Sequence, residues 1–202
     1  MIVEFAGLPR SGKSSVIEVA RDYFLRSGLQ LRMTGEAART CPFGSDHRVE
    51  IACWTANQAL NSVLAARFSL PREVLVLQDR GLFDALAFFR LLLDEGIIRT
   101  DTLAEFSSYF ASTRWARLVD LVILFDVSPE VALERDMAAR LSAGEGTITN
   151  RSTLPKLAEA YDWAAEHYSD VFPRIERVDT TSAERVKVAR SVIRMIEDLF
   201  PR

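Results

Sequence analysis

The sequence has few cysteines, no long hydrophobic run and no excess of charge of one sign. Its two cysteines, Cys41 and Cys53, lack the spacing of a metal-binding pair. The longest purely apolar runs, such as residues 121–125, are five residues long, whereas a membrane-spanning helix needs about 20. The first residues contain neither the basic segment nor the small-residue cleavage site of a secretory signal. We therefore expect a cytoplasmic protein with no membrane segment.

Charge and sequence complexity exclude further classes of protein. The 25 basic and 28 acidic residues leave a formal net charge of −3, which disfavours binding to nucleic acid as the main activity. No repeat, low-complexity tract or linker rich in proline and glycine interrupts the chain. A chain of 202 residues can bury a core without disulfides. We expect one domain over residues 1–202.

Short apolar segments alternate with longer segments of helical periodicity. We predict strands at residues 2–6, 30–34, 73–77, 118–126 and 174–178. We predict helices around residues 16–24, 49–68, 82–94, 101–117, 131–141, 153–168 and 182–200, with Asp101 as the N-cap of the fourth. This alternation is typical of βαβ units, which form a mostly parallel sheet with helices on both faces. Ligands of such sheets bind beyond the carboxyl ends of the strands.

The first predicted strand leads into a phosphate-binding motif. Residues 7–14 (Gly-Leu-Pro-Arg-Ser-Gly-Lys-Ser), here called the phosphate loop, match the pattern G-x-x-x-x-G-K-[ST] between a strand and a helix. Its two glycines let backbone N–H groups surround an anion, and Lys13 and Ser14 suit the β- and γ-phosphates and Mg²⁺. A glycine-rich turn with a surface lysine is the alternative. We expect ATP and Mg²⁺ as cofactors, bound by Gly7, Pro9, Arg10, Ser11, Gly12, Lys13, Ser14 and Ser15.

The third predicted strand is followed by Asp79 and Arg80. A carboxylate at the end of a strand beside the phosphate loop lies near the metal, so we predict Ser14 and Asp79 as the metal-binding residues. In the alternative interpretation, Asp79 caps the helix that follows. The planar guanidinium of Arg80 suits recognition of a planar anion.

Several segments resemble thymidylate kinases and deoxynucleoside kinases. Residues 79–88 (Asp-Arg-Gly-Leu-Phe-Asp-Ala-Leu-Ala-Phe) are similar to the Asp-Arg motif of thymidylate kinases and the helix after it, with Asp84 where that family commonly has Ser. Residues 119–135 resemble the fourth strand and following helix of both families. Arg10 matches a loop arginine of one thymidylate kinase subgroup, and residues 178–181, including Thr180, resemble the loop beside the adenine of ATP.

This resemblance implies a P-loop NTPase fold. The expected fold class is α/β, a three-layer α/β/α arrangement with a five-stranded parallel sheet of order 2-3-1-4-5. A lid is expected at about residues 135–152. In kinases of this type the lid brings arginines to the transferring phosphoryl group, which implies that role for Arg135 and Arg140. Solvated arginines on a surface helix are the alternative.

The end of the second predicted strand departs from the thymidylate kinase pattern. Where that family has an Arg-Glu-Pro-Gly-Gly-like stretch, residues 34–39 read Thr-Gly-Glu-Ala-Ala-Arg. A lone Glu36 resembles the carboxylate of deoxynucleoside kinases that acts as a base toward the 5′-hydroxyl, and it also resembles nicotinamide riboside kinase-type proteins. Arg39 and Arg80 could instead bind an acceptor phosphate. These residues are compatible with either a hydroxyl or a phosphate acceptor, and Glu36 favours the hydroxyl.

The predicted helix at residues 49–68 carries an aromatic ring and amides opposite its apolar stripe. Trp54, Asn57 and Gln58 share this face, which suits stacking on a base and hydrogen bonding to its edge. The alternative is a solvated face, with Trp54 packed beneath the lid or in a homodimer interface.

The expected activity is ATP- and Mg²⁺-dependent phosphoryl transfer to a small-molecule acceptor, a nucleoside or nucleotide. A regulatory P-loop NTPase and a kinase for a nucleic-acid end are the alternatives. The predicted catalytic residues are Lys13, Arg10, Glu36, Asp79, Arg80, Arg135 and Arg140. The predicted acceptor-binding residues are Glu36, Arg39, Trp54, Asn57, Gln58, Arg80 and Asp84.

Overall fold

The computed structural model describes residues 1–139 and 148–200. Their strands form one parallel sheet of five strands in the order β2-β3-β1-β4-β5, which confirms the predicted topology. The strands are β1 (Ile2–Gly7), β2 (Leu31–Thr34), β3 (Leu75–Asp79), β4 (Leu121–Asp126) and β5 (Ile175–Asp179). The central strand β1 is buried along its whole length, so the phosphate loop that follows it begins in the middle of the sheet.

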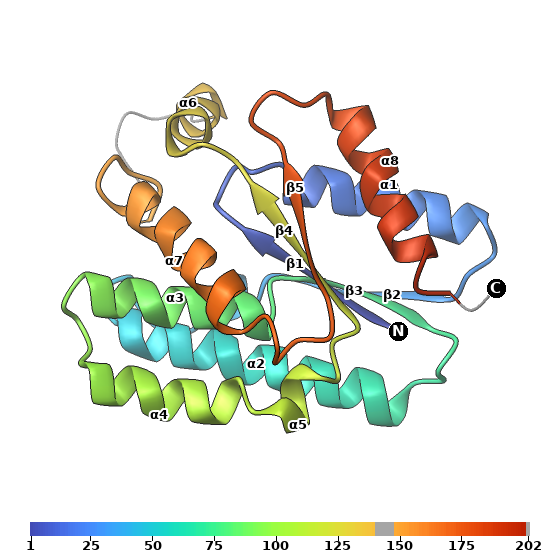
Figure 1. Ribbon diagram of the computed structural model, residues 1–202. Coiled ribbons are helices and arrows are strands. Elements are labelled where there is room, and N and C mark those ends of the chain that lie inside the picture. The colour runs from blue at the N-terminus through green and yellow to red at the C-terminus, as the bar shows by residue number, and fades with distance from the viewer. Residues whose placement is uncertain (140–147, 201–202) are drawn as a thin grey trace.

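Helices cover both faces of the sheet (Figure 1). The helices are α1 (Lys13–Arg26), α2 (Arg48–Ser69), α3 (Leu82–Asp94), α4 (Thr100–Phe110), α5 (Thr113–Ala116), α6 (Pro129–Ala139), α7 (Thr153–His167) and α8 (Arg185–Glu197), with a 3₁₀ helix η1 (Ala37–Thr40) after β2. Helices α1 and α8 pack on one face, where Val3 and Phe5 of β1 point. Helices α2, α3, α4 and α7 cover the other, where Ile2 and Ala6 point. None of the helices in the described part of the chain is long and apolar enough to cross a membrane.

The prediction of one helix at residues 101–117 was wrong in two respects. The single helix expected at residues 101–117 is divided into α4 and α5, because the hydroxyl of Ser112 accepts a hydrogen bond from the Arg114 N–H and starts a new helix. Asp101 is not the N-cap of α4. That position is Arg99, and the Asp101 carboxylate accepts from the N–H of its neighbour Thr102 within the first turn.

Strand β3 begins and ends two residues later than predicted, at Leu75 and Asp79. Its buried residues continue through Gln78, which is 2 % exposed although it is polar. Phe5 of β1 pairs with Asp79 in the sheet. The Asp79 carboxylate therefore lies at the carboxyl edge of the sheet, beside the start of the phosphate loop.

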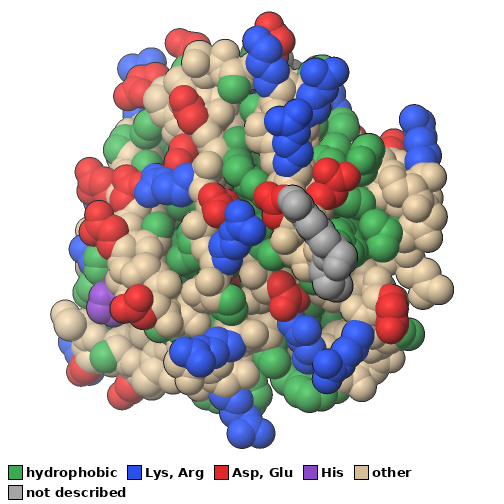
Figure 2. All heavy atoms as spheres, turned by 45° about the vertical axis from the view of Figure 1, so that its right-hand side comes forward, with side chains coloured by type: hydrophobic (Ala, Val, Ile, Leu, Met, Phe, Trp, Pro, Cys, Tyr) green, Lys and Arg blue, Asp and Glu red, His purple; other side chains and the backbone are tan. Residues whose placement is uncertain are grey.

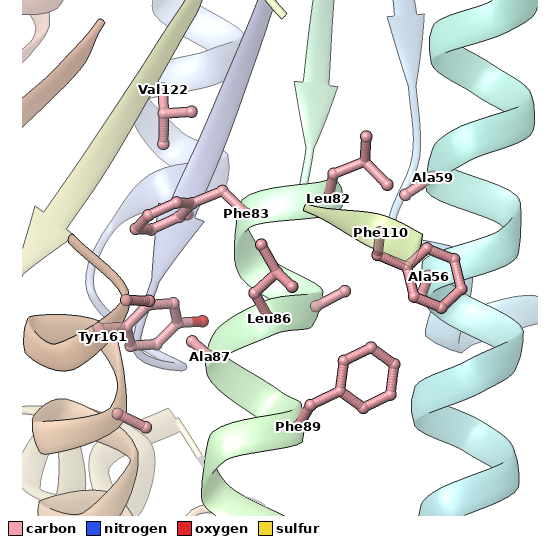
Figure 3. Packing of buried hydrophobic residues seen from close by; sticks show 14 of the residues in the cluster. Ala56, Ala59, Leu82, Phe83, Leu86, Ala87, Phe89, Phe110, Val122 and Tyr161 are labelled. Atoms are coloured by element: carbon pink, nitrogen blue, oxygen red, sulfur yellow. The ribbon is translucent and has the colours of Figure 1, made fainter. Parts of the chain in front are cut away.

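Helix α3 is buried on nearly all sides and forms the centre of the larger core. It lies between α2 and α7, and its rings Phe83 and Phe89 pack against neighbouring elements (Figure 3). A helix enclosed in this way has little freedom to shift, because protein interiors are close-packed. The residues at its N-terminus are thus held in a fixed position relative to β1.

Gly7 provides a first test of how tightly β1 and β4 approach. Its φ is +131°, and a Cβ there would lie 2.4 Å from the carbonyl oxygen of Phe125. We expect Gly7→Ala to lower the free energy of unfolding by about 2–5 kcal/mol, since backbone strain and overlap with β4 add together. Equilibrium unfolding in urea measures this loss.

Gly28 is the matched control for that variant. Its φ is +81°, but no atom lies within 4 Å of the position of an added Cβ. Gly28→Ala therefore carries only the backbone strain, and an equal loss in both variants would show that Phe125 does not constrain Gly7.

Candidate active site

A cavity of about 680 Å³ opens at the carboxyl edge of the sheet. The phosphate loop forms one end, and η1, α2 and α3 form the walls. Arg135 and Ile148 also line it. The cavity thus lies where parallel α/β sheets bind their ligands.

The phosphate loop holds Lys13 in a buried position. Its ammonium donates to the carbonyl oxygens of Gly7 and Leu8 at 2.7 and 2.8 Å, and to the hydroxyl of Ser11 at 3.3 Å. Burial lowers the pKa of Lys13 to about 7, and the nearby positive charge of Arg80 adds to this effect. A bound phosphate would favour the charged amine, because an opposite charge at short range stabilises it.

The N-terminus of α1 is open toward the cavity. Gly12 is its N-cap, with φ of +89°, and no side chain caps the first turn. Unpaired N–H groups at a helix N-terminus favour an anion. The arrangement therefore suits the phosphates of a nucleotide, with Ser14 in the first turn of the same helix.

Asp79 is placed to take part in metal binding. Its Oδ1 atom is buried and has no hydrogen-bond partner among the described residues. Burial raises the pKa of this carboxyl group, while Lys13 and Arg80 oppose the shift. No cluster of three or more potential protein ligands for a metal occurs within residues 1–139 and 148–200. A buried carboxylate oxygen without a partner suits Mg²⁺, which commonly binds one or two protein groups and completes its shell with water and phosphate oxygens.

Arg80 is the centre of a charged network in the wall of the cavity. Its Nε donates to Glu36 at 2.8 Å, and its Nη1 donates to Asp84 at 2.9 Å. Glu36 also accepts from Arg39 at 3.3 Å. Burial raises the pKa of Glu36, but the charges and hydrogen bonds of Arg80 and Arg39 outweigh it, so the net pKa is lowered. The structure therefore brings these four predicted residues together, with Glu36 ionised at neutral pH.

Tyr161 of α7 also belongs to this network, although no motif identified it. Its hydroxyl lies 2.5 Å from Asp84 Oδ1 and 3.1 Å from the Gly7 carbonyl oxygen, and it accepts from Arg80 at 3.2 Å. Figure 3 shows the ring pointing from α7 toward α3. The sequence offers one signal for Tyr161, its place on the apolar stripe of a helix. A buried tyrosine hydroxyl usually has a hydrogen-bond partner, so this position indicates a polar contact in the core.

The Tyr161 hydroxyl should therefore stabilise the fold. We expect Tyr161→Phe to lower the free energy of unfolding by about 1–3 kcal/mol, because Asp84 and Gly7 lose a buried partner. Urea unfolding measures this loss. Tyr109→Phe is the control, since Tyr109 is 51 % exposed. Equal stability of the two variants would contradict a structural role for the Tyr161 hydroxyl.

Arg135 links the residue after β5, Thr180, to the phosphate loop. Arg135 donates to the carbonyl oxygens of Thr180 at 2.7 Å and Arg10 at 3.3 Å. The Arg10 side chain itself pairs with Asp136 of α6 at 2.8 Å. The predicted lid is described only in part, and Arg140 lies outside the described residues.

The predicted base-stacking face of α2 does not line the cavity. The residues of α2 that do so are Arg48, Ile51, Ala52, Thr55 and Ala59. Trp54 instead contacts the ring of Phe43 edge-on at 6.0 Å, and the amide of Asn57 donates to the carbonyl oxygen of Cys53 in its own helix. Gln58 is likewise absent from the cavity wall. The cavity is bordered by the edge of the apolar stripe, and not by the polar face opposite it.

The strand order, the phosphate loop after β1 and the acidic end of β3 define a P-loop kinase. The chain is 33% identical to the thymidylate kinase of Tropheryma whipplei (strain Twist) over 144 residues, which cover 67% of this chain and 68% of that protein. The chain belongs to the thymidylate kinase family, and it is a phosphotransferase for nucleosides or nucleotides. A scan of family models gave no match.

Solved structures of a deoxyadenosine kinase from M. mycoides share the fold. The structure with bound dATP has a TM-score of 0.71, and the one with the products dCMP and a flexible dCDP has a TM-score of 0.70. Each match covers 98% of this chain and 100% of that chain at 15% sequence identity. At this level of identity the likeness concerns the fold alone.

Proposed function

We propose that the protein transfers the γ-phosphoryl group of ATP, with Mg²⁺, to a hydroxyl group of a nucleoside. The network around Arg80 carries this proposal. Two carboxylates, Glu36 and Asp84, already compensate the guanidinium charge at 2.8 and 2.9 Å. An acceptor phosphate would lie beside these two negative charges and be repelled, whereas a neutral hydroxyl would not.

Glu36 would act as the general base of this reaction. A hydroxyl must lose its proton as it attacks the phosphoryl group, and a carboxylate within hydrogen-bond reach can take it. The lowered pKa of Glu36 keeps it ionised at neutral pH. Arg80 fixes its orientation through the Nε hydrogen bond.

The phosphate loop would bind the donor. Lys13 and the N–H groups of the loop would contact the phosphates, and Arg10 and Arg135 lie at its edge. Ser14 and Asp79 would bind Mg²⁺ or its water shell. When bound, the metal supplies positive charge that stabilises the transferring phosphoryl group.

The body of the acceptor would lie between α2 and α3. There the cavity wall is largely apolar, with Ile51, Phe88 and Leu92. A flat ring gains from burial against such a surface. At the same wall lies Arg48, which pairs with Glu95 and brings a charged group within reach of a base edge.

A nucleoside monophosphate is the second candidate acceptor. It is supported by the relative named thymidylate kinase and by Arg39, whose side chain is 75% exposed and can turn toward a phosphate. A regulatory NTPase would not need the acceptor cavity beside its phosphate loop. A kinase for nucleic-acid ends is disfavoured, since Figure 2 shows basic and acidic side chains interspersed on the face it presents.

A panel of acceptors tests the proposal. Purified protein with ATP and Mg²⁺ is offered the common nucleosides, their 5′-monophosphates and a control without acceptor, and the products are identified by mass. We expect nucleoside-dependent formation of ADP and a nucleoside monophosphate. Phosphorylation of monophosphates alone would replace the proposal by the second candidate, and steady hydrolysis without an acceptor would favour the regulatory NTPase.

A further inference from the structure

Glu4 is a fully buried carboxyl group in the middle of the central strand. It is 0% exposed, and it lies on the face of β1 that packs against α3. Burial raises its pKa to about 8, with a further contribution from the charge of Asp84, although hydrogen bonds from backbone N–H groups oppose the shift. Burying such a group costs free energy unless it is hydrogen-bonded, so its contacts indicate what it does.

The partners of Glu4 are the first N–H groups of α3. Its two carboxyl oxygens accept from the N–H of Asp84 at 2.8 Å and from that of Phe83 at 3.2 Å. The N-cap of α3 is Gly81, which has no side chain to perform this role. Glu4 therefore caps α3 from another element, and it satisfies N–H groups that a buried helix end would otherwise leave unpaired.

The turn between β3 and α3 is fitted around this carboxyl group. A Cβ at Gly81 would lie 2.4 Å from the Glu4 carboxyl carbon and from Oε2, so any side chain there would displace the Glu4 carboxyl group. The preceding residue, Arg80, has a left-handed backbone with φ of 63°, and its N–H donates to the Phe5 carbonyl oxygen at 3.0 Å. Two adjacent residues of β1 thus fix the backbone on both sides of Gly81.

We propose that Glu4 is a positioning residue for phosphoryl transfer, which sets the placement of Arg80 and Asp84 relative to the phosphate loop. Glu4 and Gly7 belong to the same strand, so the cap of α3 and the start of the phosphate loop share one rigid element. Arg80 directly precedes Gly81, the N-cap of α3, and the N–H of Asp84 donates to the Glu4 carboxyl group. This inference rests on the proposed function, in which Arg80, paired with Asp84, orients the general base Glu36.

The first test compares Glu4→Gln with Val3→Ala. Glutamine keeps the size but places an NH₂ group against one of the N–H groups of α3, so the first turn should shift. We expect kcat/KM for the acceptor to fall about 10- to 100-fold, as for a misplaced catalytic group, while KM for ATP changes less than about twofold. Val3 is buried on the opposite face of β1, so Val3→Ala controls for lost core stability and should lower the thermal midpoint without this selective effect.

The second test uses Gly81→Ala alone and together with Glu4→Ala. The methyl group of Gly81→Ala overlaps the carboxyl group, so acceptor kcat/KM should fall. Removing the carboxyl group relieves the overlap, so the double variant should retain more activity than the product of the two single effects predicts. The comparison of the single and double variants tests the positioning role even if Glu4→Gln does not fold.

Two results would overturn the positioning role. One is a lower thermal midpoint in Glu4→Gln with unchanged kinetic constants. The other is an equal loss of kcat/KM for ATP and for the acceptor. The comparison uses whichever acceptor the panel identifies. A monophosphate acceptor would thus replace the proposed function while the effect of Glu4 remained measurable.

Discussion

Lys13→Ala is expected to abolish phosphoryl transfer while the protein remains folded. Among residues 1–139 and 148–200 the ammonium donates hydrogen bonds only to its own loop, to Gly7, Leu8 and Ser11, and burial already lowers its pKa to about 7. Its removal should therefore change the thermal midpoint little in the absence of nucleotide. Loss of the charge that faces the phosphates should lower kcat on the order of 10³-fold or more.

Thermal unfolding with and without ATP shows whether this loss arises in nucleotide binding. A ligand at 100 times its Kd stabilises the folded state by about 2.7 kcal/mol, and this stabilisation should disappear in Lys13→Ala. Lys187→Ala is the control, because Lys187 of α8 is 73% exposed and pairs only with Glu184 among the described residues. Unchanged binding of ATP by Lys13→Ala would contradict the assignment of the phosphate loop.

The sequence predicts the fold well because its signals are local. Short apolar runs mark the strands, and the glycine-rich loop marks where the central strand ends. The motif residues Lys13, Ser14 and Asp79 follow from the same reasoning, since the first two begin the helix after the central strand and Asp79 ends β3. The break at Ser112 depends on a single capping hydrogen bond, which periodicity does not reveal.

The cavity wall between α2 and α3 is less accessible to sequence analysis, because it is largely apolar. Periodicity along α2 separates apolar from polar positions, but it does not distinguish a residue in the core from one that borders a cavity. Ile51 and Ala52 line the cavity from the edge of the apolar stripe, whereas Trp54 on the polar side does not. Tyr161 and Glu4 reach the network around Arg80 from distant parts of the chain, so only the three-dimensional structure relates them.

Glu36→Gln is expected to separate the two acceptor classes. Glutamine can still accept from Arg80 Nε through its amide oxygen, so the network should keep its shape while the base is lost. For a nucleoside acceptor, kcat should fall by on the order of 10²- to 10⁴-fold with little change in KM. Steady-state kinetics with the acceptor from the panel measures both constants. Glu176→Gln is the control, since Glu176 of β5 also pairs with an arginine but lies away from the cavity.

If the acceptor is a monophosphate, we expect Arg39→Ala and Arg80→Ala to impair acceptor binding, whereas Glu36→Gln should leave kcat intact. Arg39→Ala is the more informative of the two, because its side chain is 75% exposed and its only partner among the described residues is Glu36. Arg80→Ala would also leave Glu36 and Asp84 without their shared counter-charge, so its effect mixes acceptor binding with local stability. For a phosphate acceptor, Arg39→Ala should chiefly raise the acceptor KM. An intact kcat in Glu36→Gln together with loss of acceptor binding in Arg39→Ala would show that the hydroxyl proposal is wrong, since a base is needed only where a proton must leave.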